Sequence, residues 1–313
     1  MSEFFMKFVV SERAGVEAAL RRGLPLSRLA GAGRLNEALE YAVFPGGKRL
    51  RPALALLASR LAGASTKQGL AVACAVEFLH TSSLILDDLP SMDDADVRRN
   101  RRALHLVYGE GVAVLAAVAL LNQSYALLSD AACGGDGGAL LREAARCVGP
   151  DGMVGGQVVD LETRAAAADE EALACRDLKT VALMRLMMTA GAHACGARAE
   201  ETLTLADFGE CFGRAYQVCD DVWDETGAGE VLGKPARQDA RHRRASAVTG
   251  FGAGGARLFA RRLVARGVAL LHERFGPRDE VALLSDAAHY VLDAAGAARA
   301  QAPALSLREE AVA

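Results

Sequence analysis

Residues 69–96 read GLAVACAVEFLHTSSLILDDLPSMDDAD, and this stretch decides how the chain folds. Its apolar residues up to position 86 recur at three- and four-residue spacing, which predicts a helix with a buried face. Five aspartates follow within ten residues: Asp87, Asp88, Asp93, Asp94 and Asp96. A solvated acidic helix end is the ordinary interpretation, but negative charge at a helix C-terminus opposes the helix dipole. The apolar residues before the cluster place it at the rim of something buried.

The same spacing of apolar residues recurs through most of the chain, so we expect an all-α protein. The expected helices cover residues 35–43, 51–62, 69–86, 111–129, 173–195, 205–223 and 256–275. Runs of alternating β-branched residues are nearly absent, so strands are not expected. Short breaks rich in Gly and Pro separate the helices, without a long linker or an internal repeat. We therefore expect one domain over residues 1–313, with a loose tail from about Gln301.

The composition excludes several classes of protein. The net charge is −3 and no Lys/Arg stripe is visible, which argues against nucleic-acid binding. The longest apolar run, residues 111–121, is too short to span a bilayer, which requires about 20 residues. No secretion signal is visible, and the seven cysteines are odd in number and form no CxxC pair, which predicts reduced thiols. We expect a soluble, cytoplasmic protein with no membrane span.

A second acidic cluster, QVCDDVWD, closes another apolar helix and ends at Asp224. Asp220 and Asp224 are four residues apart, so their carboxylates share one helix face and can hold one hard cation. In the first cluster, Pro90 ends or kinks the helix, which lets Asp87 and Asp93 face one point. Carboxylates without His or Cys nearby suit Mg²⁺, which keeps water and phosphate oxygens in its shell. The expected ligand is a diphosphate bridged to both clusters by magnesium.

Several basic residues are placed to complete such a site. Only five of the 36 basic residues are lysines, so a lysine within a motif stands out. Lys48 and Arg51 follow a glycine pair and can project together, although an ordinary basic cap is the alternative. His80 lies two helical turns, about 10.5 Å, before Asp87, although a lone histidine is more often structural. Lys179 has apolar neighbours in a helix, so its charge requires a partner.

The order and spacing of five motifs resemble those of the trans-polyprenyl (isoprenyl) diphosphate synthases. These motifs are GGKRLRP, HTSSLILDDLPSMDDADVRR, GGQVVDLE, LKT and YQVCDDVWD, and the resemblance runs from about residue 41 to 239. The first aspartate motif, DDxxxxD, is similar to that of bacterial geranylgeranyl or farnesyl diphosphate synthases. The stretch AVLAAVALL is similar to the geranylgeranyl enzymes of carotenoid pathways. The resemblance implies the isoprenoid synthase fold, an antiparallel helical bundle around a deep central cavity, in a homodimer.

The resemblance also implies a role for each matching residue. Isopentenyl diphosphate would be held by Lys48, Arg51, His80 and Arg99. The allylic diphosphate would be held by Arg98, Lys179, Thr180, Gln217 and Lys234. Magnesium, three ions with bound diphosphate, would be carried by Asp87, Asp93 and Asp220, with help from Asp88, Asp221 and Asp224. These six aspartates and Lys179 form the expected catalytic set.

A few positions depart from the family pattern. Asn100 and Arg102 stand where Gly and Pro usually follow the arginine pair, so we expect that loop to be shaped differently. Val181 replaces the glycine usual after Lys-Thr. The second lysine expected beyond residue 239 is missing, and Arg244 is the nearest substitute.

The resemblance implies head-to-tail condensation of isopentenyl diphosphate with an allylic diphosphate. Farnesyl-making relatives of this type tend to carry a bulky aromatic residue five positions before the first aspartate. Here Ser82 and Ser83 leave the passage open, which favours a C20 product over the C15 alternative. A terpene cyclase would lack GGKRLRP, and a catalytically silent partner subunit would not require intact aspartates. The starter and the residue that forms the pocket floor remain open.

Overall fold

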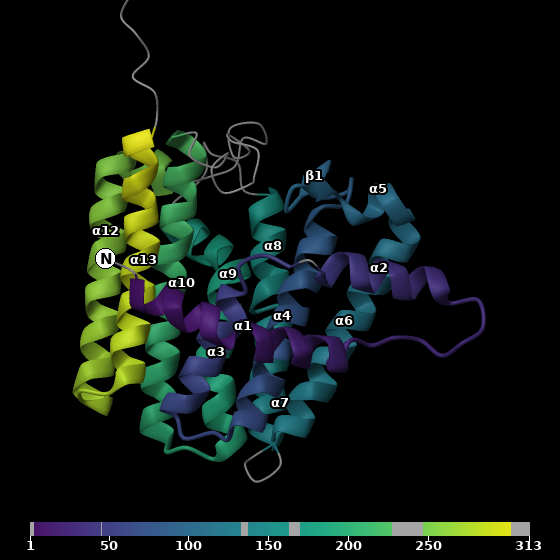
Figure 1. The fold of residues 1–313 in the computed structure, drawn as a ribbon. Coiled ribbons are helices and arrows are strands. Elements are labelled where there is room, and N and C mark those ends of the chain that lie inside the picture. The colour runs from purple at the N-terminus through teal and green to yellow at the C-terminus, as the bar shows by residue number, and fades with distance from the viewer. Residues whose placement is uncertain (1–2, 45, 133–136, 163–169, 227–246, 302–313) are drawn as a thin grey trace, which may run out of the picture.

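The computed structural model describes residues 3–44, 46–132, 137–162, 170–226 and 247–301, and it confirms the predicted all-α fold (Figure 1). The helices and strands that position the site are α1 (Glu3–Gly23), α2 (Gly33–Val43), α3 (Leu50–Leu61), α4 (Thr66–Asp87), β1 (Val97–Arg98), β2 (Arg101–Arg102), α5 (Leu104–Tyr108), α6 (Glu110–Ala131), α7 (Gly137–Val148), α8 (Met153–Glu162), α9 (Glu170–Cys195), α10 (Ala199–Thr226), α12 (Ala247–Phe275) and α13 (Asp279–Gln301). Each expected helix coincides with one of these elements to within a residue at its ends or lies inside it. Helices α1, α5, α7, α8 and α13 were not among the expected ones.

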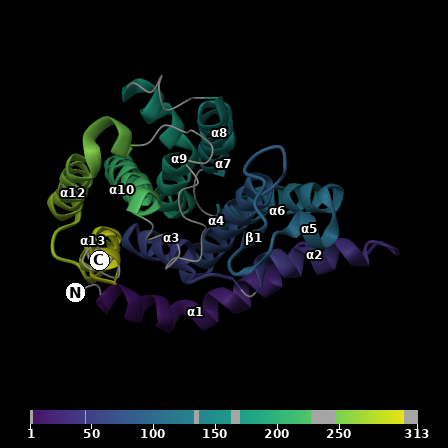
Figure 2. The same ribbon diagram turned by 90° about the horizontal axis from the view of Figure 1, so that it is seen from above.

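Helix α4 is central to the bundle and packs against α1, α2, α3, α6 and α9. Helices α10, α12 and α13 pack together on one side, and α6 lies on the other (Figures 1 and 2). Two hydrophobic clusters form the core, one with α3, α9 and α10 and the other with α1, α2 and α6. Helix α4 contributes to both clusters and is buried on most of its surface, whereas the spacing in residues 69–86 predicted one buried face.

Helix α4 begins with a capping box. The Ser65 hydroxyl accepts from the backbone N–H of Gln68, and the Gln68 side chain accepts from the backbone N–H of Ser65. The Gln68 amide also donates to the carbonyls of Ala131 and Ala194, at 3.1 and 2.8 Å. These carbonyls lie at the C-terminal ends of α6 and α9, where the helices leave carbonyls without partners of their own. One glutamine therefore joins three helix ends.

Helix α10 approaches α9 closely through two glycines. A Cβ atom on Gly209 would lie 2.9 Å from the Arg185 Cα, and one on Gly213 would lie 3.0 Å from the Val181 Cα. Val181 is buried at this contact. Gly213 thus faces the backbone of Val181 at this contact. This close approach sets the distance between the ends of α9 and α10 that carry the site.

The loop after the first acidic cluster forms an antiparallel hairpin with a two-residue turn, a small exception to the expected absence of strands. Arg99 and Asn100 occupy the turn with φ values of 53° and 60°, as a type I′ turn requires. Asn tolerates this left-handed conformation better than most residues, so Asn100 can replace a glycine. Arg101 anchors the hairpin by donating to the Phe44 carbonyl at 2.9 Å and lying over the Tyr41 ring.

Two helices, α4 and α6, are long and apolar enough to cross a membrane by length and composition. Two thirds of the apolar window of α4 is buried inside the protein, but only one third of that of α6 is buried. A core helix of a soluble protein passes the same test, so this is weak evidence for a span. The expected absence of a membrane span stays a prediction.

Candidate functional site

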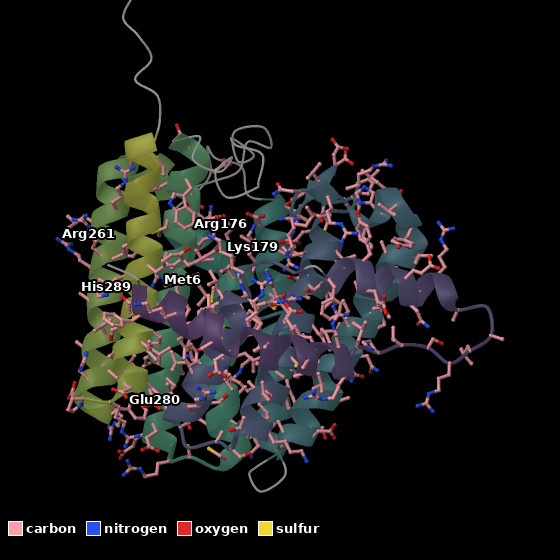
Figure 3. The ribbon with its side chains drawn as sticks, viewed as in Figure 1. Met6, Arg176, Lys179, Arg261, Glu280 and His289 are labelled. Carbon is pink, nitrogen blue, oxygen red and sulfur yellow. The ribbon has the colours of Figure 1, made fainter. Side chains whose placement is uncertain are left out.

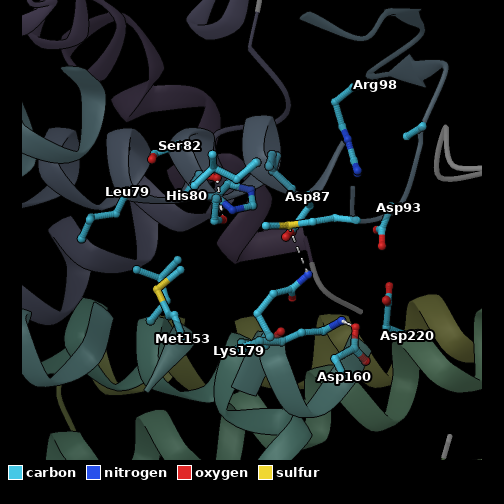
Figure 4. A pocket seen from close by; sticks show the side chains of 18 of the residues that line it. Leu79, His80, Ser82, Asp87, Asp93, Arg98, Met153, Asp160, Lys179 and Asp220 are labelled. Carbon is cyan, nitrogen blue, oxygen red and sulfur yellow. Dashed lines mark hydrogen bonds and ion pairs between the residues drawn. The ribbon is translucent and has the colours of Figure 1, made fainter. Parts of the chain in front are cut away.

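A cavity of about 840 Å³ opens among α4, α8, α9, α10 and the hairpin loop. Its volume lies in the range of small-molecule sites. Apolar side chains line its inner part: Leu79, Leu121, Val148, Met153 and Leu183. Charged side chains line the rest, and Figure 4 places Asp93 and Asp220 at the end away from Leu79 and Met153. The cavity thus has an apolar end and an acidic end, as an amphiphilic ligand requires.

The first acidic wall is formed where α4 ends. Asp88 caps the helix, and the turn through Pro90 brings the backbone N–H of Asp93 to 2.9 Å from the Asp87 carbonyl. Asp87 and Asp93 both line the cavity, so the expected break in the helix does place them together. Burial raises the pKa of Asp87 to about 6, with Lys179 lowering it and Asp93 raising it. A bound cation would favour the ionised form of Asp87.

The second acidic wall is the C-terminal part of α10. Asp220 and Asp224 line the same cavity as Asp87 and Asp93, and Figure 4 shows the carboxylates of Asp93 and Asp220 directed toward one another. Asp93 lies in the turn after α4 and Asp220 lies on α10, on opposite sides of the cavity, and the two carboxylates carry like charge. Facing carboxylates of this kind repel each other unless a cation lies between them.

In each Asp-Asp pair the second aspartate is held by an arginine. Asp88 is buried and accepts from the Nε of Arg98 at 2.9 Å. Asp221 is buried and accepts from the Nη2 of Arg176 at 2.9 Å. Asp88 and Asp221 are not among the residues that line the cavity, and their predicted roles next to magnesium stay predictions. Asp88 also engages the arginine that was expected to bind the allylic diphosphate.

Lys179 of α9 has apolar neighbours in its helix, and its charge is paired with a carboxylate of α8, Asp160. Lys179 Nζ lies 2.5 Å from Asp160 Oδ2, and both side chains line the cavity (Figure 4). The glycine pair before Gln157 makes this possible, because a Cβ atom on Gly156 would lie 2.3 Å from the backbone nitrogen of Lys179. Figure 3 shows Lys179 and Arg176 near each other on the same helix.

A chain of hydrogen bonds joins α9 to α10 behind the acidic wall. The Thr180 hydroxyl donates to the Gln217 amide oxygen at 3.0 Å, and the Gln217 amide nitrogen donates to Asp221 at 3.0 Å. Arg176 completes the chain at the other Asp221 oxygen. The predicted pair of Thr180 and Gln217 is thus brought together at the cavity, where both residues line the surface.

The predicted basic pocket is assembled only in part. Arg51, His80 and Arg99 line the cavity, and Arg51 lies over the Tyr216 ring with its Nε lacking a hydrogen-bond partner among the described residues. Lys48 is exposed, with its Nζ 3.4 Å from the Tyr290 hydroxyl of α13. Arg98 and Arg99 both line the cavity, as do Ser82 and Ser83.

The donor set fits a hard cation that is shared with a ligand. Among the residues that the structure describes, no group of three His, Cys, Asp or Glu side chains lies close enough to form a protein-only metal site. Mg²⁺ in phosphate-binding enzymes takes one or two carboxylates and completes its shell with water and phosphate oxygens. Asp87, Asp93, Asp220 and Asp224, spread over two walls, are suited to that arrangement.

Some of the site was missed or lies beyond the described residues. The predictions gave no role to Asp160, Gln157 or Arg176, although the first two stand in the quoted motif GGQVVDLE and share a helix face at a spacing of three residues. No sequence signal marked Arg176, because its pairing with Asp221 depends on how α9 and α10 pack. Lys234 and Arg244 lie outside the described residues.

The fold and the two facing acidic walls define the class of all-helical, diphosphate-handling enzymes. The model of the polyprenyl synthetase family matches residues 32–254. Farnesyl diphosphate synthase of Geobacillus stearothermophilus is 37% identical over 254 residues, 77% of this chain and 82% of the relative. The chain therefore belongs to the polyprenyl synthetase family, a family of prenyltransferases, and the resemblance found in the motifs is confirmed.

Other relatives are named as geranylgeranyl rather than farnesyl synthases. Heterodimeric geranylgeranyl pyrophosphate synthase large subunit 2 of Arabidopsis thaliana is 36% identical over 240 residues, covering 75% of this chain and 63% of that relative. The chain thus spans less than two thirds of the length of this plant relative.

Solved structures share the fold over nearly the whole chain. The apo FPP/GFPP synthase from Zymomonas mobilis has a TM-score of 0.81 at 28% identity, covering 93% of this chain and 100% of that one. The polyprenyl synthase from Caulobacter crescentus CB15, complexed with calcium and isoprenyl diphosphate, has a TM-score of 0.80 at 25% identity, covering 93% and 97%.

Proposed function

We propose that this protein condenses isopentenyl diphosphate head to tail with an allylic diphosphate, using Mg²⁺. The observation that carries the proposal is a single cavity with two facing carboxylate walls at one end and an apolar lining at the other. The family match and the calcium and isoprenyl diphosphate of the Caulobacter complex support the same chemistry.

In the proposed reaction, Asp87, Asp93, Asp220 and Asp224 hold the allylic diphosphate through magnesium, three ions by resemblance to the family. When bound there, the ions would neutralise the charge that develops on the departing diphosphate. Lys179 adds a positive charge on the same side, and Asp160 fixes its position. Water would capture the allylic cation that remains, and the apolar inner lining prevents this by keeping water away from the cation.

The second substrate, isopentenyl diphosphate, is proposed to bind at Arg51, His80 and Arg99, with Lys48 joining from the rim. Its double bond attacks the allylic carbon, a new carbon–carbon bond forms, and the carbon–oxygen bond to the allylic diphosphate breaks. A proton then leaves the adjacent carbon for the departing diphosphate. The protein supplies no nucleophile in this sequence, and its role is to orient the two substrates and stabilise charge.

We propose a C20 product, with C15 as the alternative. Ser82 and Ser83 line the cavity and are small, and the apolar lining continues beyond them to Leu121, Val148 and Met153. Relatives named for both farnesyl and geranylgeranyl products match this chain at similar identity, so these names do not distinguish the two lengths.

The direct test uses the purified chain alone with Mg²⁺, isopentenyl diphosphate and C5, C10 or C15 allylic diphosphates, followed by mass analysis of the products. A linear C20 diphosphate is the expected result, and a C15 end product would support the alternative length. Cyclic hydrocarbons would indicate a terpene cyclase. Absence of turnover by the folded chain alone would support the partner-subunit reading and contradict the proposal.

We also propose that the protein is a homodimer, as the family resemblance implies. Helix α6 exposes three large apolar side chains, Val114, Leu115 and Val118, and the neighbouring α5 exposes Leu106 and Val107. Apolar patches of this kind on a folded protein mark contact surfaces. Size-exclusion chromatography with light scattering should give twice the chain mass, and Leu115→Arg should shift the mass toward the monomer. A monomeric wild-type protein would contradict this proposal.

A further inference from the structure

Glu77 is a buried acidic residue to which none of the roles above has been assigned. It lies in the middle of α4, three residues before His80, and its side chain is 3% exposed. A buried carboxylate is strongly unfavourable unless cations pair with it. Its neighbours along the helix, Val76 and Phe78, are fully buried and apolar. A carboxylate at this place therefore requires a reason beyond the packing of the helix.

One partner of Glu77 is Arg49, the arginine inside the GGKRLRP motif. Its Nη1 lies 2.5 Å from Glu77, its Nε lies 2.8 Å from Glu17, and its Nη2 donates to the Val43 carbonyl at 2.8 Å. Its guanidinium lies against Gly46, where a Cβ atom would come within 1.9 Å. Arg49 thus turns inward, and its guanidinium is paired with protein groups. The other basic residues of the motif face elsewhere: Lys48 is exposed and Arg51 lines the cavity.

The other partner of Glu77 is Arg99, which lines the cavity. Its Nη2 lies 3.6 Å from Glu77 Oε1, and its side chain is 24% exposed. Burial lowers the pKa of Arg99, Glu77 raises it, and Arg49, Arg51 and Arg98 lower it further. Glu77 thus pairs with both Arg49 and Arg99 and offsets part of the repulsion that Arg99 meets from Arg49, Arg51 and Arg98.

We propose that Glu77 is a positioning residue for the diphosphate of isopentenyl diphosphate, acting through Arg99. By holding Arg99 at the cavity wall before any ligand binds, Glu77 offsets the repulsion between Arg99 and Arg49, its two ion-pair partners. Its second ion pair, with Arg49, fixes the loop from which Arg51 projects. This inference rests on the proposed function, because it takes the corner of Arg51, His80 and Arg99 as the isopentenyl diphosphate site.

The first test compares Glu77→Gln with Glu17→Gln. Each variant removes one carboxylate from Arg49, but only Glu77 contacts Arg99. Glu77→Gln keeps the shape of the side chain and should raise the KM for isopentenyl diphosphate about tenfold, or about 1.4 kcal/mol. The KM for the allylic diphosphate should change less than twofold. Glu17→Gln should leave both KM values within twofold of the wild-type values. Equal increases in the two variants would overturn the inference.

A double-mutant cycle with Arg99→Gln tests the route of the effect. If Glu77 acts through Arg99, then Glu77→Gln should add little to the rise in KM already caused by Arg99→Gln. Additive effects would mean that Glu77 acts elsewhere, and would contradict the inference. Melting temperatures show whether a variant has lost activity because it is misfolded. If Glu77→Gln does not fold, Glu77→Asp, which keeps the charge but withdraws it from Arg99, replaces it in both comparisons.

A final measurement separates this inference from the proposed function. Inorganic pyrophosphate binding, followed by calorimetry without Mg²⁺, requires no turnover. Weaker binding by Glu77→Gln than by Glu17→Gln would support the role of Glu77 even if the wild-type protein formed no prenyl product. If the two variants bind pyrophosphate equally and the wild-type protein is active, the inference about Glu77 is overturned while the proposed function stands.

Discussion

The two aspartates of each Asp-Asp pair occupy different environments. The first member of each pair, Asp87 or Asp220, lines the cavity, and the second, Asp88 or Asp221, is buried against an arginine. The family resemblance gave the first members the main role next to magnesium and the second members a helping one, and the structure separates the members by burial. Substitutions within a pair should therefore produce different kinds of damage.

Asp220→Ala should lower kcat by at least about a hundredfold while leaving the melting temperature near that of the wild type. Its carboxylate lines the cavity, where removal of one of several like charges relieves repulsion. Asp221→Ala should instead lower the melting temperature clearly, because it leaves Arg176 buried beside fewer carboxylates. Kinetics and differential scanning calorimetry of both variants check the contrast. Equal thermal stability of the two variants would contradict the division of roles.

The raised pKa of Asp87, about 6, predicts how magnesium affects stability. Without metal, the folded state favours the protonated carboxyl between about pH 4 and 6, so this group makes unfolding easier as pH rises through that window. Mg²⁺ requires the ionised form, so protons compete with it below about pH 6. The rise in Tm caused by Mg²⁺ should therefore be larger at pH 7 than at pH 5. A rise that does not depend on pH would contradict this linkage.

At the scale of helices, glycines allow close contacts between helices, and these contacts set the positions of the site residues. Gly156 lets α8 lie against α9 at Lys179, and Gly213 lets α10 lie against Val181. The sequence was sufficient to predict the long helices of the site, α4, α9 and α10, because their apolar periodicity extends over many turns. It was not sufficient to predict α8, whose ten residues contain two glycines, or the pairing of Lys179 with Asp160, which depends on the register between two helices.

Gly156→Ala should separate α8 from α9, since the added Cβ atom would meet the Lys179 backbone nitrogen at 2.3 Å. We expect a loss of activity of about a hundredfold, because Asp160 would no longer fix Lys179, and a small displacement near reacting groups has that effect. Gly15→Ala is the matched control, since nothing lies within 4 Å of its added Cβ atom in α1. The control should keep full activity and gain about 0.5–1 kcal/mol of stability. Activity and urea unfolding of both variants give the answer.

The whole molecule is a helical bundle whose cavity was predictable in outline but not in depth. Motifs on α4, α9 and α10 indicated an acidic site, and the structure brings Asp87, Asp93, Asp220 and Asp224 to one cavity. The inner lining comes from α6, α7 and α8 as well, and apolar residues on those helices have no distinctive spacing. The residues that limit the product therefore could not be chosen from the sequence.

Ser82→Phe should shorten the product from C20 to C15. The Ser82 hydroxyl donates to the Ala117 carbonyl of α6 at 2.9 Å, so a phenyl ring has little room toward α6 and must turn into the cavity. Product analysis by mass spectrometry checks this, with Ser11→Phe at an exposed position of α1 as the control that should leave the length unchanged. An unchanged product from Ser82→Phe would show that the limit lies deeper, near Leu121 or Met153.

Helix α4 carries Glu77, His80, Ser83 and Asp87 along one rigid rod at the centre of the bundle. Gln68 pins the start of that rod to two other helix ends. His80, proposed for isopentenyl diphosphate, and Asp87, proposed for the allylic diphosphate, are therefore joined by one helix, so a shift of an outer helix leaves the spacing between them unchanged. We expect that spacing to hold while the bundle opens to admit a long tail.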